Sequence, residues 1–302
     1  MLVLNYEGRG SSPLSDTVIG LFTMHSSIPQ LSDSQLFAID SAKALIRNKK
    51  VLVLTGAGLS TDSGIPDYRG EGRIARHPMT YDTFMGSFEA RQRYWARSFV
   101  GWSRIAMAIP NSGHRAIASA ETSGQVFGLI TQNVDGLHTQ AGSSNVVDLH
   151  GRLDRVICLD CRNLLPRRQM DSMLEELNPT ISKDTNVEFT PDGDAEVAGT
   201  ERFIVPGCPN CSGILKPDVV FFGENVPKDR VDNSFEMIAE AEVLLVAGTS
   251  LTVNSGFRFA RAADKESKPI VIVNIGPTRA DNLASVKIEA NTSKALERLL
   301  VD

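Results

Sequence analysis

The chain has 302 residues, 42% of them hydrophobic, with a formal net charge of −5 and a pI of about 5.6. This length suits one large domain, or one domain with a smaller module, and the hydrophobic content is ordinary for a protein that buries a core. The acidic balance does not favour a polyanion-binding surface, so we expect no nucleic-acid partner. No apolar run approaches the roughly 20 residues that span a bilayer, so we expect no membrane partner either.

Residues 1–30 precede the first regular pattern. They carry Arg9 beside the acidic Glu7 and Asp16. A secretory signal needs a basic start before its apolar stretch, and a mitochondrial transit peptide needs several arginines and few acids. We therefore expect an N-terminal extension on a cytoplasmic protein, or on a mitochondrial one if the source is a eukaryote.

Alternating helix and strand signals follow. Ser32, with its polar neighbours, predicts the start of a helix over roughly 35–48, and a continuous apolar run at 51–54 predicts a strand buried on both faces. Similar runs recur at 126–130, 146–149, 219–222, 243–246 and 270–273. Helical stretches separate several of these runs. The alternation predicts an α/β fold with a Rossmann-like, doubly wound parallel sheet.

Two regions interrupt this alternation. Residues 71–110 are rich in arginine and aromatic residues and lack a buried-strand pattern, which predicts a helical insertion with a loop at its front. Residues 151–216 contain all the cysteines and a polar middle. The predicted division is a Rossmann-like domain (31–70, 111–150 and 217–302), a small domain with helical part 71–110, and a zinc-binding module at 151–216.

All four cysteines lie in two C-x-x-C pairs, formed by Cys158 with Cys161 and by Cys208 with Cys211. Two such pairs predict one tetrahedral zinc ion, and four thiolates leave no open position for catalysis, so the zinc should be structural. A redox role is the alternative. It is less well supported, because neither pair opens a thioredoxin-like strand–helix unit.

A glycine-rich turn follows the first predicted strand. Gly56, Gly58 and Gly64 give a G-x-G-x(5)-G pattern, which lets backbone approach a pyrophosphate at a helix N-terminus. A tight turn without a ligand is the alternative reading. A dehydrogenase would next show a second strand ending in an acidic residue, whereas this chain continues into a loop at 64–70.

The segment GAGLSTDSGIPDYRG at 56–70 resembles the cofactor loop of the sirtuins. The resemblance continues in TQNVD (131–135), LHG (149–151), KPD (216–218), FGE (222–224) and GTS (248–250), in family order from about residue 31 to the C-terminus. RYWAR (93–97), PDGD (191–194) and NIGPTR (274–279) resemble the class II branch. That branch includes the mitochondrial sirtuin associated with lipoamidase and ADP-ribosyl transfer.

The resemblance implies NAD-dependent deacylation of lysine in an acylated protein or peptide. In this reaction the acyl oxygen attacks C1′ of the nicotinamide ribose, and nicotinamide leaves. A ribose hydroxyl, deprotonated through a histidine, then completes the transfer that yields O-acyl-ADP-ribose. Protein mono-ADP-ribosyl transfer and lipoamidase activity are alternatives on the same scaffold. A dehydrogenase or a non-enzymatic NAD-sensing module is less well supported, and the oligomeric state stays open, with a monomer compatible.

The resemblance also assigns site residues. His150 follows an apolar run, so it should lie at a strand's carboxyl end, where an imidazole can accept a proton near neutral pH. Asn133 and Asp135 are expected to act with it on the ribose and an ordered water. The cofactor-binding residues are Gly56, Ala57, Gly58, Ser60, Thr61, Gly64, Ile65, Pro66, Asp67, Tyr68, Arg69, Gln132, Asn133, Val134, Asp135, Gly248, Thr249, Ser250, Asn274, Ile275, Gly276 and Thr292.

The expected substrate contacts lie in three segments. The residues that would pair with the peptide backbone are Val220, Phe222, Gly223 and Glu224. The peptide would add as a strand between them and residues 253–256, where Asn254, Ser255 and Gly256 stand in place of the Pro-Ala pair of many sirtuins. Tyr94 and Arg97 are spaced i, i+3, which resembles the pair that recognises acidic acyl chains in class III sirtuins. The alternative is that Arg97 is solvated or paired on the surface while Tyr94 packs.

Overall fold

The computed structural model describes residues 31–68, 78–181 and 200–301. The chain divides into two compact units, Met1–Leu31 and Ser32–Asp302, and the elements below all belong to the second. Arg69, the PDGD segment and the whole of the expected N-terminal extension at 1–30 lie outside the described residues.

A six-stranded sheet forms the larger core, with the strand order β3-β2-β1-β7-β8-β9 and every pairing parallel. Its strands are β1 (Val51–Thr55), β2 (Val126–Thr131), β3 (Val146–Asp148), β7 (Val243–Ala247), β8 (Ile270–Val273) and β9 (Val286–Ile288). Every residue of β1, β7 and β8 is buried, as expected when helices cover both faces of a sheet. The predicted parallel sheet is confirmed, and the apolar runs in these strands account for it.

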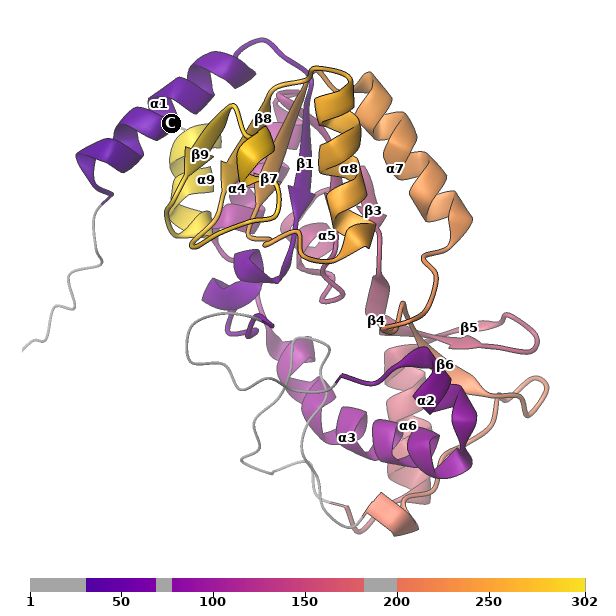
Figure 1. Ribbon diagram of the computed structural model, residues 1–302. Helices are drawn as coiled ribbons and strands as arrows, with labels where there is room; N and C mark the ends of the chain where they lie inside the picture. The colour runs from indigo at the N-terminus through magenta and orange to yellow at the C-terminus, as the bar shows by residue number, and fades with distance from the viewer. Residues whose placement is uncertain (1–30, 69–77, 182–199, 302) are drawn as a thin grey trace, which may run out of the picture. The chain divides into compact units, whose positions relative to one another are not determined.

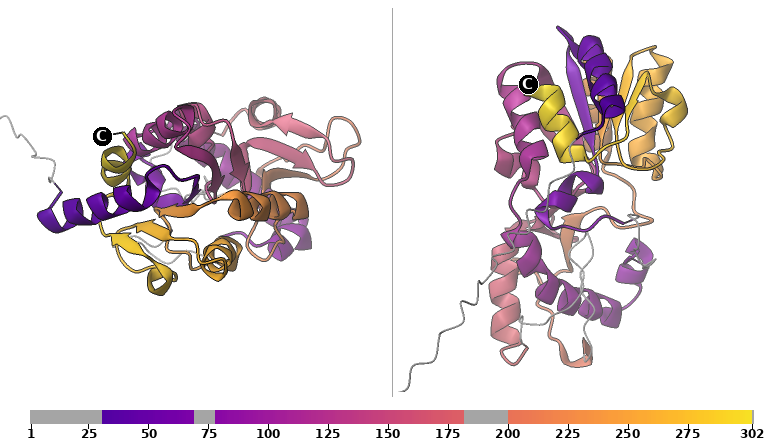
Figure 2. Two further views of the ribbon diagram at one scale, coloured as in Figure 1. Left: turned by 90° about the horizontal axis from the view of Figure 1, so that it is seen from above. Right: turned by 90° about the vertical axis from the view of Figure 1, so that its left-hand side faces the viewer.

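Helices cover both faces of this sheet (Figures 1 and 2). On one face lie α1 (Asp33–Ile46), α4 (Ser112–Thr122), α5 (Leu137–Ala141) and α9 (Thr292–Leu300), and on the other lie α7 (Lys228–Glu240) and α8 (Asn254–Lys265). Ser32 caps α1 in a reciprocal capping box with Gln35, as the sequence predicts for its start. The short helix η1 (Ala57–Ser63) follows β1, and the short helix η3 (Asp281–Leu283) lies between β8 and β9.

A second, antiparallel sheet has the order β5-β4-β6, with β4 (Gly151–Cys158), β5 (Leu164–Pro166) and β6 (Leu215–Val219). The predicted parallel strand at 219–222 is therefore wrong. That run begins where β6 ends, and Phe222 is 40% exposed and makes one isolated bridge with Thr80. Its apolar character comes from packing in the smaller core, where Phe221 contacts Phe84 and Tyr94.

The smaller core joins the antiparallel sheet to α2 (Tyr81–Gly86), α3 (Phe88–Met107), α6 (Arg167–Leu177) and η2 (Thr200–Arg202). Trp95 is fully buried there and donates from Nε1 to the carbonyl of Leu215. The guanidinium of Arg167, also buried, lies over the Trp95 ring and forms an ion pair with Asp171 at 2.9 Å. The predicted helical insertion is confirmed by α2 and α3.

Candidate functional site

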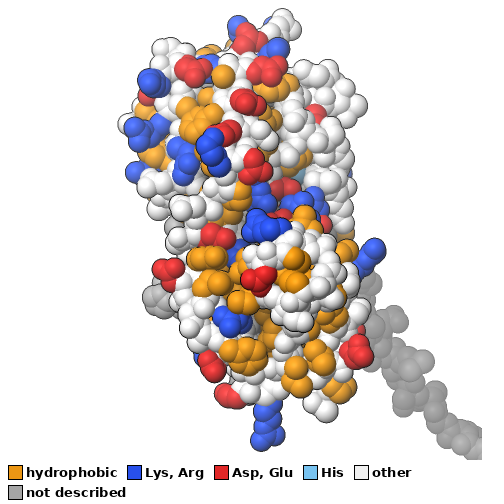
Figure 3. Space-filling view, turned by 90° about the vertical axis from the view of Figure 1, so that its right-hand side faces the viewer, with side chains coloured by type: hydrophobic (Ala, Val, Ile, Leu, Met, Phe, Trp, Pro, Cys, Tyr) orange, Lys and Arg blue, Asp and Glu red, His pale blue; other side chains and the backbone are white. Residues whose placement is uncertain are grey.

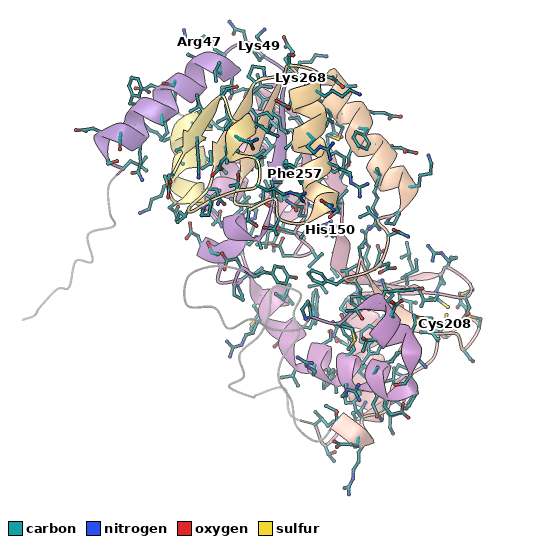
Figure 4. The ribbon with its side chains drawn as sticks, viewed as in Figure 1. Arg47, Lys49, His150, Cys208, Phe257 and Lys268 are labelled. Atoms are coloured by element: carbon teal, nitrogen blue, oxygen red, sulfur yellow. The ribbon has the colours of Figure 1, made fainter. Side chains whose placement is uncertain are left out.

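The predicted site residues meet at the carboxyl edge of the six-stranded sheet. Thr55, Thr131 and Ala247 end three neighbouring strands, and the glycine-rich turn, the TQNVD segment and the GTS segment follow them directly. His150 lies two residues after β3, on the same edge, and Figure 4 shows it below α8. Ligands of open α/β sheets bind at this edge, where the strand order reverses.

The glycine-rich turn is locked against the loop that follows β7. Gly58 N–H donates to the carbonyl of Gly248 over 2.8 Å. A Cβ on Gly56 would lie 2.6 Å from Cβ of Thr249, and one on Gly58 would lie 2.9 Å from the Gly248 oxygen. Real Cβ atoms do not come so close to other atoms, so both glycines are needed for the two loops to meet. Beside Gly64 and Gly276, by contrast, a Cβ would meet no atom within 4 Å.

A short chain of hydrogen bonds ties the glycine-rich turn to the TQNVD segment. Ser60 Oγ donates to Asp135 Oδ2 over 2.7 Å and accepts from Asn133 Nδ2 at 3.1 Å. Asn133 Nδ2 also reaches the Gly56 carbonyl, and Asp135 Oδ1 accepts from the Leu137 amide at 2.9 Å. Burial raises the pKa of Asp135, and its hydrogen bonds to Leu137 and Ser60 oppose that shift. The structure thus brings together the two side chains that the sequence assigns to the ribose.

Two hydrogen bonds fix the ring of His150. Its Nδ1 lies 3.0 Å from the carbonyl of Gln132, and its Nε2 lies 2.8 Å from Ser255 Oγ. Because a carbonyl can only accept, Nδ1 carries the proton and donates it to Gln132. The Nε2 atom of the neutral ring therefore holds the free electron pair, and the Ser255 hydroxyl donates to it.

The surroundings of His150 keep it neutral. The pKa of His150 is lowered to about 4, chiefly by burial and to a smaller extent by the charges of Arg230 on α7 and Arg258 on α8, while the bond to the Gln132 backbone opposes the shift. An imidazole that is unprotonated at neutral pH is available to accept a proton. The sequence placed His150 at this edge of the sheet, but it gave no sign of these two arginines.

Sequence reasoning missed two residues at the site. Ser255 was noted only as a departure from a Pro-Ala pair, yet its hydroxyl contacts His150. Asn111, the N-cap of α4, donates from Nδ2 to the Leu59 carbonyl and to Ser63 Oγ, so it holds η1 against α4. An asparagine ahead of a helix is a recognisable cap, but a single sequence does not reveal which distant loop its amide reaches.

The residues expected to bind the peptide substrate lie next to the backbone of His150, in the segment that follows β6. The Val220 amide donates to the His150 carbonyl over 2.8 Å, and Glu224 forms an ion pair with the buried Lys216 at 3.0 Å. The rings of Phe222 and Tyr68, both 40% exposed, meet edge to face with their centroids 6.2 Å apart.

The second peptide-pairing segment differs from the expected extended one. Residues 254–256 form the first turn of α8, because the chain turns into the helix directly after Val253. On α3, Tyr94 is buried against Phe84 and Phe221, and Arg97 is partly buried. The helix predicted for this pair is confirmed, and its role in binding an acyl group stays a prediction.

Residues expected near the adenosine lie after β8 and at the start of α9. Asn274 Nδ2 donates to the carbonyls of Ile275 and Gly276, and Gly276 adopts a positive φ of 78°. Ile275 is 69% exposed, whereas Thr292 is buried as the first residue of α9.

The four cysteines form one cluster in the smaller core. Their Sγ atoms all lie within 4.8 Å of one another, with Cys158 and Cys211 at 3.5 Å and Cys161 and Cys208 at 3.7 Å. A tetrahedral zinc ion with Zn–S bonds of about 2.3 Å requires sulfur atoms roughly 3.8 Å apart. The cluster therefore fits a single structural zinc, as the sequence predicts.

On the face shown in Figure 3, positive and negative side chains are interspersed, and no single sign dominates. None of the helices in the described ranges combines the length and the apolar composition that crossing a bilayer requires.

Comparison with known proteins agrees with this site. Residues 56–255 match the Sir2 family. An NAD-dependent protein deacetylase of Xanthomonas campestris pv. campestris is 51% identical over 83% of this chain and 86% of its own length. The human mitochondrial NAD-dependent protein lipoamidase sirtuin-4 is 44% identical over 95% of this chain and 92% of its own.

A solved structure of Sir2 with a p53 peptide and NAD+ superposes with a TM-score of 0.68 at 27% identity, and covers 89% of this chain and 97% of that one. The fold, the clustered cysteines and the extent of sequence identity lead to one conclusion. The chain belongs to the Sir2 family.

Proposed function

We propose that this protein is an NAD-dependent protein-lysine deacylase that releases nicotinamide and O-acyl-ADP-ribose. The observation that carries the proposal is the neutral His150, whose proton-free Nε2 lies at the carboxyl edge of the sheet, the edge at which Asn133 and Asp135 follow β2. The names of the relatives support it, since they include NAD-dependent protein deacetylases. NAD supplies the ribose carbon that takes the acyl oxygen and the hydroxyl that is deprotonated.

The residues of this chain would divide the work in the following way. The locked loops at Gly56 and Gly248 bind the phosphates and hold the dinucleotide in place. Asn133 and Asp135 orient the nicotinamide ribose through hydrogen bonds, and Ser60 fixes both of their side chains. His150 accepts the proton of the ribose hydroxyl at Nε2, since its other ring nitrogen already carries a proton.

The acylated lysine would reach this centre between the exposed ring of Phe222 and the start of α8. One edge of the 220–224 segment is already used within the chain, because the Tyr81 amide donates to the Phe222 carbonyl. On the other edge, the Phe221 amide donates to Glu224 Oε2 and the Phe221 carbonyl accepts from the Glu224 amide, so pairing with a peptide would use the remaining backbone groups of the segment. The two separate cores support a division into a Rossmann-like domain and a smaller zinc-bearing domain, in which zinc maintains structure.

A second candidate concerns the acyl group. The human relative is named a lipoamidase, and the match extends over 92% of its length, which favours lipoyl-lysine among the acyl groups to be tested.

The cellular location is a separate question. The four cysteines are free of disulfides, and the relatives are bacterial and mitochondrial proteins. Both observations support a cytoplasmic location, or a mitochondrial one in a eukaryotic source.

The test is nicotinamide release by purified protein with NAD, in the presence and absence of acetyl-lysine and lipoyl-lysine peptides of one sequence. Deacylation predicts that release depends on the acyl-peptide and that free lysine peptide appears with it. Release without acyl-peptide, together with a protein that gains the mass of ADP-ribose, would instead identify mono-ADP-ribosyl transfer and refute the proposal.

A further inference from the structure

The first turn of α8 makes three contacts with neighbouring segments, and one of them reaches His150 directly. Asn254 Oδ1 accepts from Arg279, Ser255 Oγ lies 2.8 Å from His150 Nε2, and Gly256 packs against Gln132. The hydrogen bond of Ser255 could not form from the Pro-Ala pair that many sirtuins carry here, because neither of those residues has a polar side chain.

Gly256 lets the turn approach Gln132 without moving its side-chain amide from its bonds to Thr55 and Thr249. A Cβ at this position would lie 2.5 Å from Oε1 and 2.7 Å from Cδ of the Gln132 side chain. Gln132 is also the residue whose carbonyl accepts from His150 Nδ1. The turn and the histidine therefore share one neighbour, and the close approach at Gly256 brings Ser255 within reach of the ring.

The turn is also anchored from outside. Arg279 donates to Asn254 over 2.6 Å, and its guanidinium lies 4.1 Å from the ring centroid of Phe257. Leu251, in the loop ahead of the turn, is fully buried with a positive φ of 52°. A non-glycine residue adopts this conformation only where the surrounding structure determines it. These contacts hold the first turn of α8, and Ser255 with it, in a fixed position.

We propose that Ser255 is a positioning residue for the base. Its hydroxyl holds Nε2 of the neutral His150, so that ring plane and tautomer are set from both nitrogens before the substrate hydroxyl arrives. Before the proton moves, the Ser255 hydroxyl turns its hydrogen away from Nε2, which frees the single electron pair of that atom for the ribose O–H. Nε2 then takes the ribose proton, and the imidazolium donates to Ser255 Oγ while Nδ1–H stays on the Gln132 carbonyl. Ser255 keeps its own proton, and only the direction of its O–H bond changes. This inference rests on the proposed function, in which His150 is the base.

The first arm of the test does not need turnover. Nitrogen NMR of protein labelled at histidine reports the electron pair on Nε2, and the His150 signal is identified by its loss in His150→Ala. In Ser255→Ala the Nε2 signal should move toward that of a neutral imidazole without a donor, and Ser255→Thr should restore it. An unchanged Nε2 signal in Ser255→Ala would overturn the pairing, whatever reaction the protein catalyses.

The second arm measures the reaction. Ser255→Ala should lower kcat with acyl-peptide about tenfold, the size expected for losing one hydrogen bond to the base, with KM for NAD nearly unchanged. In a His150→Ala background the same change should cost nothing further, since Ser255 acts through that ring. Ser172→Ala is the matched control, because that exposed hydroxyl contacts only its own helix at Arg168. Equal losses in both backgrounds would refute a role through His150.

Discussion

Ser60 and Asp135 lie 75 residues apart in the sequence, yet the Ser60 hydroxyl donates to Asp135 Oδ2 over 2.7 Å. The same hydroxyl accepts from Asn133, so one small side chain fixes both residues that are assigned to the ribose. Ser60 is 1% exposed, and water cannot easily take its place.

We therefore expect Ser60→Ala to destabilise the protein by about 1–3 kcal/mol, because it leaves two buried polar groups without this partner. NAD should also stabilise the variant less than it stabilises the wild type. Thermal unfolding with and without NAD measures both effects. Ser41→Ala removes a hydroxyl that contacts its own helix at Phe37 and should change neither quantity. A Ser60→Ala protein with wild-type unfolding and wild-type stabilisation by NAD would refute this role.

The cysteine cluster predicts one tightly bound zinc per chain. Cys161→Ser should release the metal and unfold the smaller core, since structural zinc binding is coupled to folding. Elemental analysis and thiol titration of the native protein measure occupancy and ligation. Native protein that contains no zinc, and whose four thiols all react freely, would exclude this site.

Acid should destabilise the fold through two buried histidines whose rings lie next to each other. His114 and His138 are buried, with ring centroids 4.8 Å apart. Burial lowers the pKa of His114 to about 4, with a smaller effect from Arg115, and lowers that of His138 well below 6.5, with a smaller effect from His114. Unfolded imidazoles take up protons below about pH 6.5, whereas these folded ones do not.

The free energy of unfolding should therefore be at its full value above about pH 6.5 and fall as the pH drops toward 4. His114 alone should contribute about 2 kcal/mol of this loss by pH 5. Urea unfolding at pH 7.5, 6 and 5 measures the slope. His114→Gln should flatten it, while Glu242→Gln should not, because the lowered pKa of Glu242 places its effect below pH 4.5. An identical slope in wild type and His114→Gln would contradict the assignment.

Much of this fold could be predicted from the sequence, because each strand of the parallel sheet that is buried on both faces consists of a continuous run of apolar residues. The run at 219–222 misled for the same reason: Phe221 is apolar because it packs in the smaller core, and periodicity cannot tell one core from another. The short edge strand β9 has only half-buried residues before Ile288, so it left no comparable signal.

The site residues that belong to a sequence motif could be predicted. Those that are identified only by a contact with a distant residue could not. His150 and Asn133 follow strands in recognisable segments. The hydrogen bond between Ser255 and His150 spans 105 residues and depends on the close approach of Gly256 to Gln132, which no local pattern encodes.

Selectivity among acyl groups tests whether Tyr94 and Arg97 on α3 bind the acyl chain. Tyr94 and Arg97 lie one turn apart on this helix, and a guanidinium can bind a terminal carboxylate. If Arg97 does so, Arg97→Met should lose about 1–3 kcal/mol of transition-state stabilisation on acidic acyl-lysines and little on acetyl-lysine. The measurement is kcat/KM across a matched peptide series, with Arg104→Met, two turns further on, as the control. An equal loss on both kinds of substrate would place Arg97 in the scaffold.

The central claim is that His150 serves an NAD-dependent deacylase, and product stoichiometry tests it most directly. Mass spectrometry of a reaction with NAD and an acyl-lysine peptide should show nicotinamide, free lysine peptide and O-acyl-ADP-ribose in equal amounts. His150→Ala should still bind NAD but form these products about 10²–10⁴-fold more slowly, the usual contribution of a general base. Near wild-type turnover by His150→Ala, or nicotinamide release without O-acyl-ADP-ribose, would contradict the account.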